Sequence, residues 1–241
     1  MRALRPILVV MALVLGASTA VADARPAAKP ASKPVSIAPD WSKVVAATPE
    51  GGFRMGKAAA PVKLVEYGSL TCSHCADFAR DGVPPLIANY VKTGKVSYEY
   101  RNYVLNGIDV TASLLARCAG PKGFFGMAET LYSTQPAWIG KVTAMPATEK
   151  DKLKALPEGD RLDRIAEIAG LIEVAGRYGV PAARAHACAK DQAALDRLGT
   201  MVEAAQALGV EGTPTFLLNG ENIGTQNWQS LEPLLQRAGA R

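Results

Sequence analysis

The spacing of apolar residues changes twice along the chain and separates a helical middle from two strand-bearing ends. Residues 62–67 concentrate Val, Leu and Tyr, and residues 96–103 alternate apolar and polar positions with a period of two. Both patterns predict β-strands. Residues 72–92 between them have helical spacing, although Pro84 and Pro85 must bend or break that helix. Residues 41–55 contain a short strand, a turn and an edge piece.

The middle of the chain carries no strand pattern of any strength. Helical spacing predicts helices over 109–119, 122–133, 160–178, 181–188 and 192–208, the first opening on Asp109 as a cap candidate. A strand is expected again at 213–218, where Asn219-Gly220 is a hairpin turn signal before a partner strand at 221–224. A last helix spans 228–237. The order β-α-β, helical block, β-β-α predicts one mixed sheet flanked by helices.

The first 40 residues read as an export signal and a linker. Residues 1–22 combine Arg2 and Arg5, an apolar run at 7–15 and a small-x-small cleavage pattern at 20–22. That run is much shorter than the about 20 residues of a membrane span, so we expect none after signal removal. An uncleaved anchor or a buried N-terminal helix is the alternative. Residues 23–40 are rich in Ala, Pro, Lys and Ser, which is typical of a semi-extended linker.

Composition and charge narrow the function. The chain has 27 basic and 22 acidic residues and no long basic block, so nucleic-acid binding is unsupported. A hydrophobic fraction of 49% is enough for a substantial core. In the oxidising compartment that an export signal implies, the four cysteines are expected to be paired rather than free.

The tetrapeptide Cys72-Ser73-His74-Cys75 lies between the first predicted strand and the helix that follows it. A helix beginning at Cys72 points its unpaired N–H groups and its positive dipole end at that sulfur, which favours thiolate over thiol. Two sulfurs on one helical turn can also close a disulfide and so exchange two electrons. The sequence therefore predicts a redox-active dithiol, with a zinc half-site or an inert structural disulfide as alternatives.

Two segments together carry a family resemblance: EYGSLTCSHC at 66–75 and GVEGTPT at 209–215. With them the chain resembles the thioredoxin superfamily, specifically its periplasmic DsbA-like branch. The resemblance implies an α/β, thioredoxin-like fold with an inserted all-helical domain. Residues 41–106 and 209–241 would form the thioredoxin-like domain, and residues 107–208 the helical insertion.

The resemblance also assigns roles to the dithiol motif. It implies that Cys72 is the nucleophilic, solvent-facing sulfur and that Cys75 is the buried resolving sulfur. His74 would favour the Cys72 thiolate and so make the disulfide a stronger oxidant. Strongly oxidising members of the family carry Pro-His between the cysteines, whereas this chain has Ser73-His74.

Two further positions match the family. Strand alternation places Glu66 with the apolar residues Leu64 and Val62, and a buried acid is costly unless it has a purpose. The resemblance implies that Glu66 relays a proton to or from Cys75; a carboxylate on the solvent face is the alternative. It also implies that Thr213-Pro214 forms a cis-proline loop opposite the dithiol, where a substrate strand pairs with the Thr213 backbone.

The remaining cysteines, Cys118 and Cys188, both fall in predicted helices of the middle region. We expect them to form a structural disulfide; a second redox-active pair or two buried free thiols are the alternatives. A zinc site using all four cysteines is disfavoured because this pair lacks ligand-like spacing. His186 is expected on a helix surface, with a ligand role beside Cys188 as the alternative. We predict no metal and no cofactor.

These features together predict an exported thiol–disulfide oxidoreductase that is either periplasmic or secreted. It would oxidise cysteines of unfolded exported polypeptides through a Cys72–Cys75 disulfide. The resemblance suggests a quinone-linked membrane partner of the DsbB type for reoxidation. A disulfide isomerase or reductase and a non-enzymatic copper-binding dithiol protein are the alternative functions.

Overall fold

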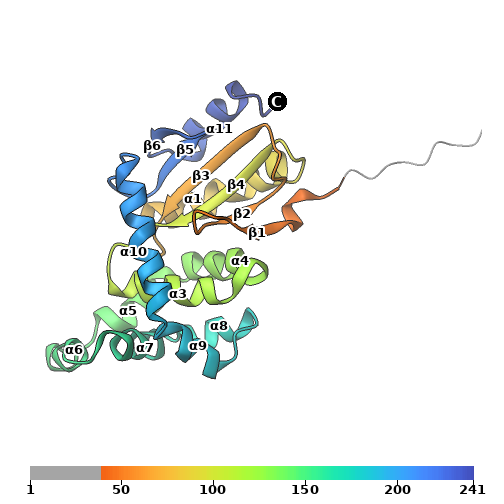
Figure 1. Ribbon diagram of the computed structural model, residues 1–241. Helices are drawn as coiled ribbons and strands as arrows, with labels where there is room; N and C mark the ends of the chain where they lie inside the picture. The colour runs from red at the N-terminus through yellow and green to blue at the C-terminus, as the bar shows by residue number, and fades with distance from the viewer. Residues whose placement is uncertain (1–38) are drawn as a thin grey trace, which may run out of the picture. The chain divides into compact units, whose positions relative to one another are not determined.

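Two parallel strands form the centre of a mixed sheet in the computed structural model, which describes residues 39–241 (Figure 1). These are β3 (Val62–Gly68) and β4 (Val96–Asn102), the two strands predicted most directly from the sequence. β2 (Phe53–Met55) and β1 (Val45–Ala47) extend the sheet beyond β4. On the other side, β5 (Thr215–Leu218) pairs antiparallel with β3 and is followed by β6 (Glu221–Gly224). The predicted signal and nearly all of the predicted linker lie outside the described residues.

Helices follow the strands in the predicted order. A 3-10 turn covers Trp41–Lys43, and α1 (Ser73–Asp81), α2 (Val83–Leu86) and a π-helical turn (Ile87–Val91) connect β3 to β4. α11 (Trp228–Arg237) closes the chain. Between β4 and β5 the structure contains helices and no strand: α3 (Gly107–Cys118), α4 (Gly120–Ser133), α5 (Gln135–Thr143), α6 (Ala147–Lys154), α7 (Glu158–Ala169), α8 (Leu171–Arg177), α9 (Ala182–Ala189) and α10 (Gln192–Ala207).

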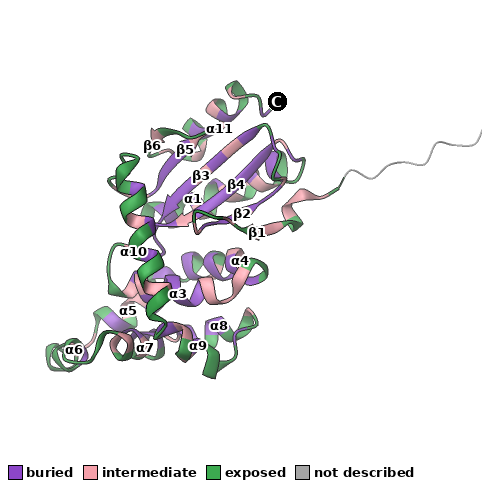
Figure 2. Cartoon of the chain, in the orientation of Figure 1, coloured by how far each residue is buried: buried purple, intermediate pink, exposed green. Residues whose placement is uncertain are grey.

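Both faces of the sheet are covered, so its central strands are buried (Figure 2). On one face, Leu64 and Phe216 pack with Phe78 of α1 and Leu231 of α11. On the other, apolar residues of β3 and β5 pack against the end of α10. Such two-sided burial explains why β3 reads as a dense apolar run.

The helical region shares a core with the start of α1. Phe124 of α4 stacks on Phe53 of β2, with ring centroids 4.2 Å apart. Leu70 and Cys75 belong to the same buried cluster. The segment that carries the dithiol is therefore packed from both the sheet and the helices.

The helix predicted over 72–92 is interrupted, but at Gly82 and not at Pro84-Pro85 as expected. α1 ends at Asp81, and Gly82 separates it from α2. A Cβ at Gly82 would lie 2.4 Å from the Phe78 ring, so only glycine fits this close approach. Pro84 and Pro85 lie within the first turn of α2, where a missing N–H costs nothing.

Three other expectations in the helical region need correction. The helix predicted over 160–178 is two helices, because Gly170 adopts a left-handed φ of 74° between α7 and α8. Helices α5 and α6 were not predicted. Asp109 is not the cap of α3: the cap is Asn106, whose side chain accepts a hydrogen bond from the Asp109 N–H.

The hairpin forms as its turn signal predicted, with φ values of 52° at Asn219 and 90° at Gly220. β5 begins at Thr215 rather than at Thr213, which leaves Thr213 and Pro214 in the preceding loop. Among the described helices, none has the length and apolar character needed to cross a membrane.

Candidate active site

The dithiol lies where β3 passes through a short loop into α1. Cys72 is the N-cap residue of α1, with an extended backbone, and Cys75 occupies the first helical turn. The Cys72 carbonyl accepts the hydrogen bond of the Ala76 N–H, so the helix begins directly at the first sulfur-bearing residue. Both cysteines are free thiols. The unpaired N–H groups of the first turn therefore surround Cys72, as the sequence suggested.

The surroundings of Cys72 stabilise a negative charge on its sulfur. The pKa of this half-buried thiol falls to about 5, chiefly because the Cys75 thiol hydrogen-bonds to it. A contact with Thr213 and the backbone N–H groups of Cys75 and His74 act in the same direction, while burial opposes them. Cys72 is therefore a thiolate at neutral pH.

Cys75 has the opposite character. It is fully buried, and burial raises the pKa of its thiol, with the hydrogen bond to Cys72 and the nearby Glu66 adding to the effect. Two sulfurs on one helical turn thus differ sharply in acidity. The exposed one holds charge and the buried one holds a proton.

The loop before β5 lies against Cys72. The Thr213-Pro214 peptide bond is cis, and the Thr213 carbonyl oxygen lies 3.2 Å from Cys72 Sγ, where it accepts a hydrogen bond when Cys72 is protonated. The Thr213 hydroxyl is buried and has no hydrogen-bond partner within residues 39–241. Residues more than 140 positions apart in the chain are thereby brought together at one sulfur.

Glu66 lies on the face of β3 that α1 covers, and 1% of its surface is exposed. Its Oε2 accepts a hydrogen bond from the Tyr98 hydroxyl at 2.5 Å. Burial raises the pKa of the carboxyl to about 8, against the opposing effect of that hydrogen bond. A carboxyl with this pKa can give or take a proton near neutral pH.

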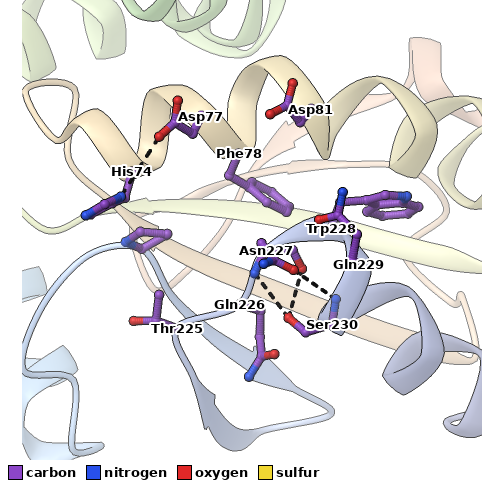
Figure 3. Close-up of a pocket in the computed structure, with 11 residues that line it drawn as sticks. His74, Asp77, Phe78, Asp81, Thr225, Gln226, Asn227, Trp228, Gln229 and Ser230 are labelled. Carbon is purple, nitrogen blue, oxygen red and sulfur yellow. Dashed lines mark hydrogen bonds and ion pairs between the residues drawn. The ribbon is translucent and has the colours of Figure 1, made fainter.

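His74 lies at the surface, and its side chain is 79% exposed. Its Nδ1 is 3.9 Å from Asp77 Oδ2, the contact drawn in Figure 3. No hydrogen bond joins its imidazole to Cys72 among the described residues; the His74 backbone N–H is what acts on that sulfur.

A cavity of about 360 Å³ extends from His74 and Pro214 along α1. Figure 3 shows Phe78 pointing from α1 into this space, with Trp228 at the start of α11 as a second aromatic lining residue. Its lining includes His74, which lies between the two cysteines in the sequence, and Pro214 of the loop that lies against Cys72.

Three polar residues of the helical region hold the loop before Cys72, and the sequence did not identify them as part of the site. Buried Asp109 accepts hydrogen bonds from the N–H groups of Leu70 and Leu105, each at 2.9 Å. Gln135 donates to the carbonyls of Leu70 and Cys72. The position of Asp109, an acidic residue near the start of a predicted helix, was a local signal for a special role. The sequence analysis interpreted it as a helix cap and not as a residue that holds the loop before Cys72.

The third residue is Tyr132, whose hydroxyl donates to the Ser69 carbonyl at 3.1 Å. It also pairs with the Tyr100 hydroxyl at 2.7 Å. Nothing in the local pattern of Gln135 or Tyr132 marks them, because their partners lie more than 30 positions away.

Cys118 and Cys188 are joined by a disulfide in the structure, with their Cα atoms 6.2 Å apart. The bond links the end of α3 to α9. His186, on α9, donates a hydrogen bond from Nδ1 to the Asp163 carboxylate at 2.7 Å and lies at the partly exposed surface.

Comparisons with known proteins agree with this architecture. A family model described as thioredoxin matches residues 48–237. A Rickettsia felis protein named as a protein-disulfide oxidoreductase is 25% identical over 198 residues, which cover 81% of this chain and 63% of that relative. The chain thus spans under two thirds of that relative's length.

Two solved structures extend the comparison. A protein-disulfide isomerase from Novosphingobium aromaticivorans superposes with a TM-score of 0.71 at 29% identity, covering 77% of this chain and 96% of the other. For alpha-DsbA1 from Wolbachia pipientis the TM-score is 0.62 at 20% identity, and the match covers 77% of this chain and 89% of the other. This second match shows similarity of fold. The predicted thioredoxin-like α/β fold with its helices is confirmed.

The raised pKa of Glu66 predicts how stability depends on pH. In the oxidised protein, where the dithiol does not titrate, burial still raises the pKa of folded Glu66. The folded protein therefore keeps this proton through a pH window that begins near about pH 4.3, where an unfolded glutamate loses it. The free energy of unfolding should therefore fall as pH rises through this window, by at most about 1.4 kcal/mol per unit.

Glu66→Gln keeps the side-chain size and removes this titration. Asp109, whose pKa burial raises to about 6, titrates in both proteins, so the comparison is made above that pH. Urea unfolding at pH 6.5, 7 and 7.5 should show a fall in stability for the wild type and a flatter profile for the variant. Parallel profiles would show that Glu66 is ionised in the folded protein.

Proposed function

The chain belongs to the thioredoxin family, and we propose that it is a thiol–disulfide oxidoreductase that oxidises cysteine pairs in other polypeptides. The observation that carries the proposal is the contrast between the two sulfurs: the pKa of half-exposed Cys72 falls to about 5, while buried Cys75 stays protonated. A disulfide between them breaks readily because its reduced form is stabilised by the Cys72 thiolate.

The reaction begins with the Cys72–Cys75 disulfide. A substrate thiolate attacks the accessible Cys72 sulfur and breaks the bond to Cys75, whose sulfur leaves with the electron pair. Glu66, protonated at neutral pH in its buried position, supplies the proton that neutralises this sulfur. The product is a mixed disulfide between Cys72 and the substrate.

A second substrate thiolate then attacks the substrate sulfur of the mixed disulfide. Cys72 leaves as a thiolate, which its surroundings stabilise, and the substrate gains a disulfide. Two electrons and the substrate protons have passed from the substrate to the enzyme and the solvent. A low thiol pKa makes Cys72 a good leaving group and so favours release of the oxidised product.

The substrate would lie along the Thr213-Pro214 loop and the groove beside it. The Thr213 carbonyl lies against Cys72, and Phe78 and Trp228 line the adjoining cavity. An extended polypeptide can pair with exposed backbone there, and its side chains can enter the groove. His74 contributes its backbone N–H at Cys72, and its side chain lines the groove.

Reoxidation needs an electron acceptor, for which we propose a quinone-linked membrane protein of the DsbB type. We also propose that the protein is exported to the periplasm by the signal at residues 1–22. Both proposals rest on the sequence and the family. The Cys118–Cys188 bond is in keeping with an oxidising compartment.

Replacing the cysteines tests the assignment of roles. Cys72→Ser should abolish oxidation of a dithiol peptide, because the attacked sulfur is lost. Given glutathione disulfide, Cys75→Ser should accumulate a mixed disulfide between Cys72 and glutathione and release one glutathione thiolate, since the Cys75 sulfur that would displace the bound glutathione is missing. Both are measured by mass spectrometry of acid-quenched reactions.

The double variant Cys118→Ser/Cys188→Ser is the matched control. It should be less stable but should still oxidise the peptide through Cys72 and Cys75. Full turnover in Cys72→Ser would exclude this residue as the nucleophile.

The direction of electron transfer is tested by the reduction potential. An isomerase is the second candidate, because the Novosphingobium structure carries that name. Equilibration with glutathione buffers should give about −120 mV for an oxidant, the outcome expected from the acidity of Cys72. A value of about −180 mV would favour the isomerase and one of about −270 mV a reductase, and either would contradict the proposed direction.

A further inference from the structure

A second cavity, of about 380 Å³, lies on the sheet between α4 and the helices that follow the dithiol. Its volume falls in the range of small-molecule sites, about 300–1,000 Å³. β3 and β4 form its floor, with Glu66 and Tyr98 among the lining side chains. Its walls come from the start of α2, the π-helical turn and α4, and are mainly apolar: Val83, Pro84, Ile87, Phe125 and Ala128.

The lining of this cavity includes acidic side chains but no basic ones. Its lining contains no lysine, arginine or histidine, and its titratable residues are Glu66, Glu129 and three tyrosines. Glu129 is exposed, so its carboxylate lies at the rim. An anionic guest would meet this carboxylate with no cation to compensate it, whereas an uncharged apolar guest would gain from leaving water.

One hydrogen-bonding position in the cavity is unfilled. Glu66 is almost completely buried. Of its two carboxyl oxygens, only Oε2 accepts a hydrogen bond, from the Tyr98 hydroxyl. The hydroxyls of Tyr100 and Tyr132 are paired with each other at 2.7 Å. Within the described part of the chain Oε1 has no partner. Because Tyr98 donates to Oε2, the acid proton lies on Oε1 and can be donated to a guest.

We propose that this cavity binds an uncharged, largely apolar small molecule with one hydrogen-bond acceptor, which the Glu66 carboxylic acid satisfies. The proposal does not depend on the redox activity of the dithiol. Burial, which raises the pKa of Glu66 to about 8, keeps the acid protonated at neutral pH and so keeps the donor in place.

Three probes of similar shape test it: acetophenone, ethylbenzene and benzoate. Each is titrated into the oxidised protein at pH 6.5 and followed by NMR of the methyl groups of Val83 and Ile87. Acetophenone should bind about tenfold more tightly than ethylbenzene, since only it accepts a hydrogen bond. Benzoate should not bind measurably. Saturation with acetophenone should also raise the pKa of Glu66, read from its side-chain carbon.

Two variants, a test and a matched control, each replace one exposed alanine with tryptophan. Ala88 is exposed at the edge of the cavity, and Ala88→Trp should fill its mouth and lower the acetophenone affinity at least tenfold. Ala193→Trp, on the exposed surface of α10, should leave the affinity unchanged. Equal affinities for acetophenone and ethylbenzene, absence of acetophenone binding, or full binding to Ala88→Trp would each overturn the proposal. Oxidation of a dithiol peptide by the guest-free protein, measured separately, tests the dithiol, so a failure of the proposed function is distinguished from a failure of this proposal.

Discussion

The stabilisation of negative charge on one sulfur, and not on its neighbour, is the interaction on which the site depends. Cys72 takes this charge because it caps α1, so N–H groups and the Cys75 thiol all point at it. Cys75 lies one turn deeper, in apolar surroundings that disfavour charge. Each unit of pKa difference corresponds to about 1.4 kcal/mol, so the difference between the two thiols is large on the scale of disulfide exchange.

This arrangement is held from outside the α/β part of the fold. The loop that presents Cys72 receives hydrogen bonds from Gln135 and Tyr132 and donates one to Asp109, all in the helical region. Phe124 stacks on the sheet and shares a core with Cys75. The helices therefore position Cys72, the proposed nucleophile, as well as cover the sheet, which links their packing to the proposed chemistry.

The sequence predicted most elements because their patterns are local. β3 and β4 are dense in β-formers, and Asn219-Gly220 adopts the left-handed turn that its composition favours. The roles given to Glu66 and to the cis bond at Pro214 came from family resemblance, since the sequence alone left each open. The break at Gly170 was missed because apolar spacing continues across it. Gln135 could not have been found, because its backbone partners are assigned only by the tertiary structure.

A titration of the Cys72 thiol in the reduced protein, followed by thiolate absorbance near 240 nm, tests this charge stabilisation most directly. We expect a single transition with a midpoint near pH 5, with the Cys75 thiol remaining protonated throughout. A midpoint near the value of an ordinary cysteine, about 8.5, would contradict it, because the N-terminus of α1 would then give the sulfur no special acidity.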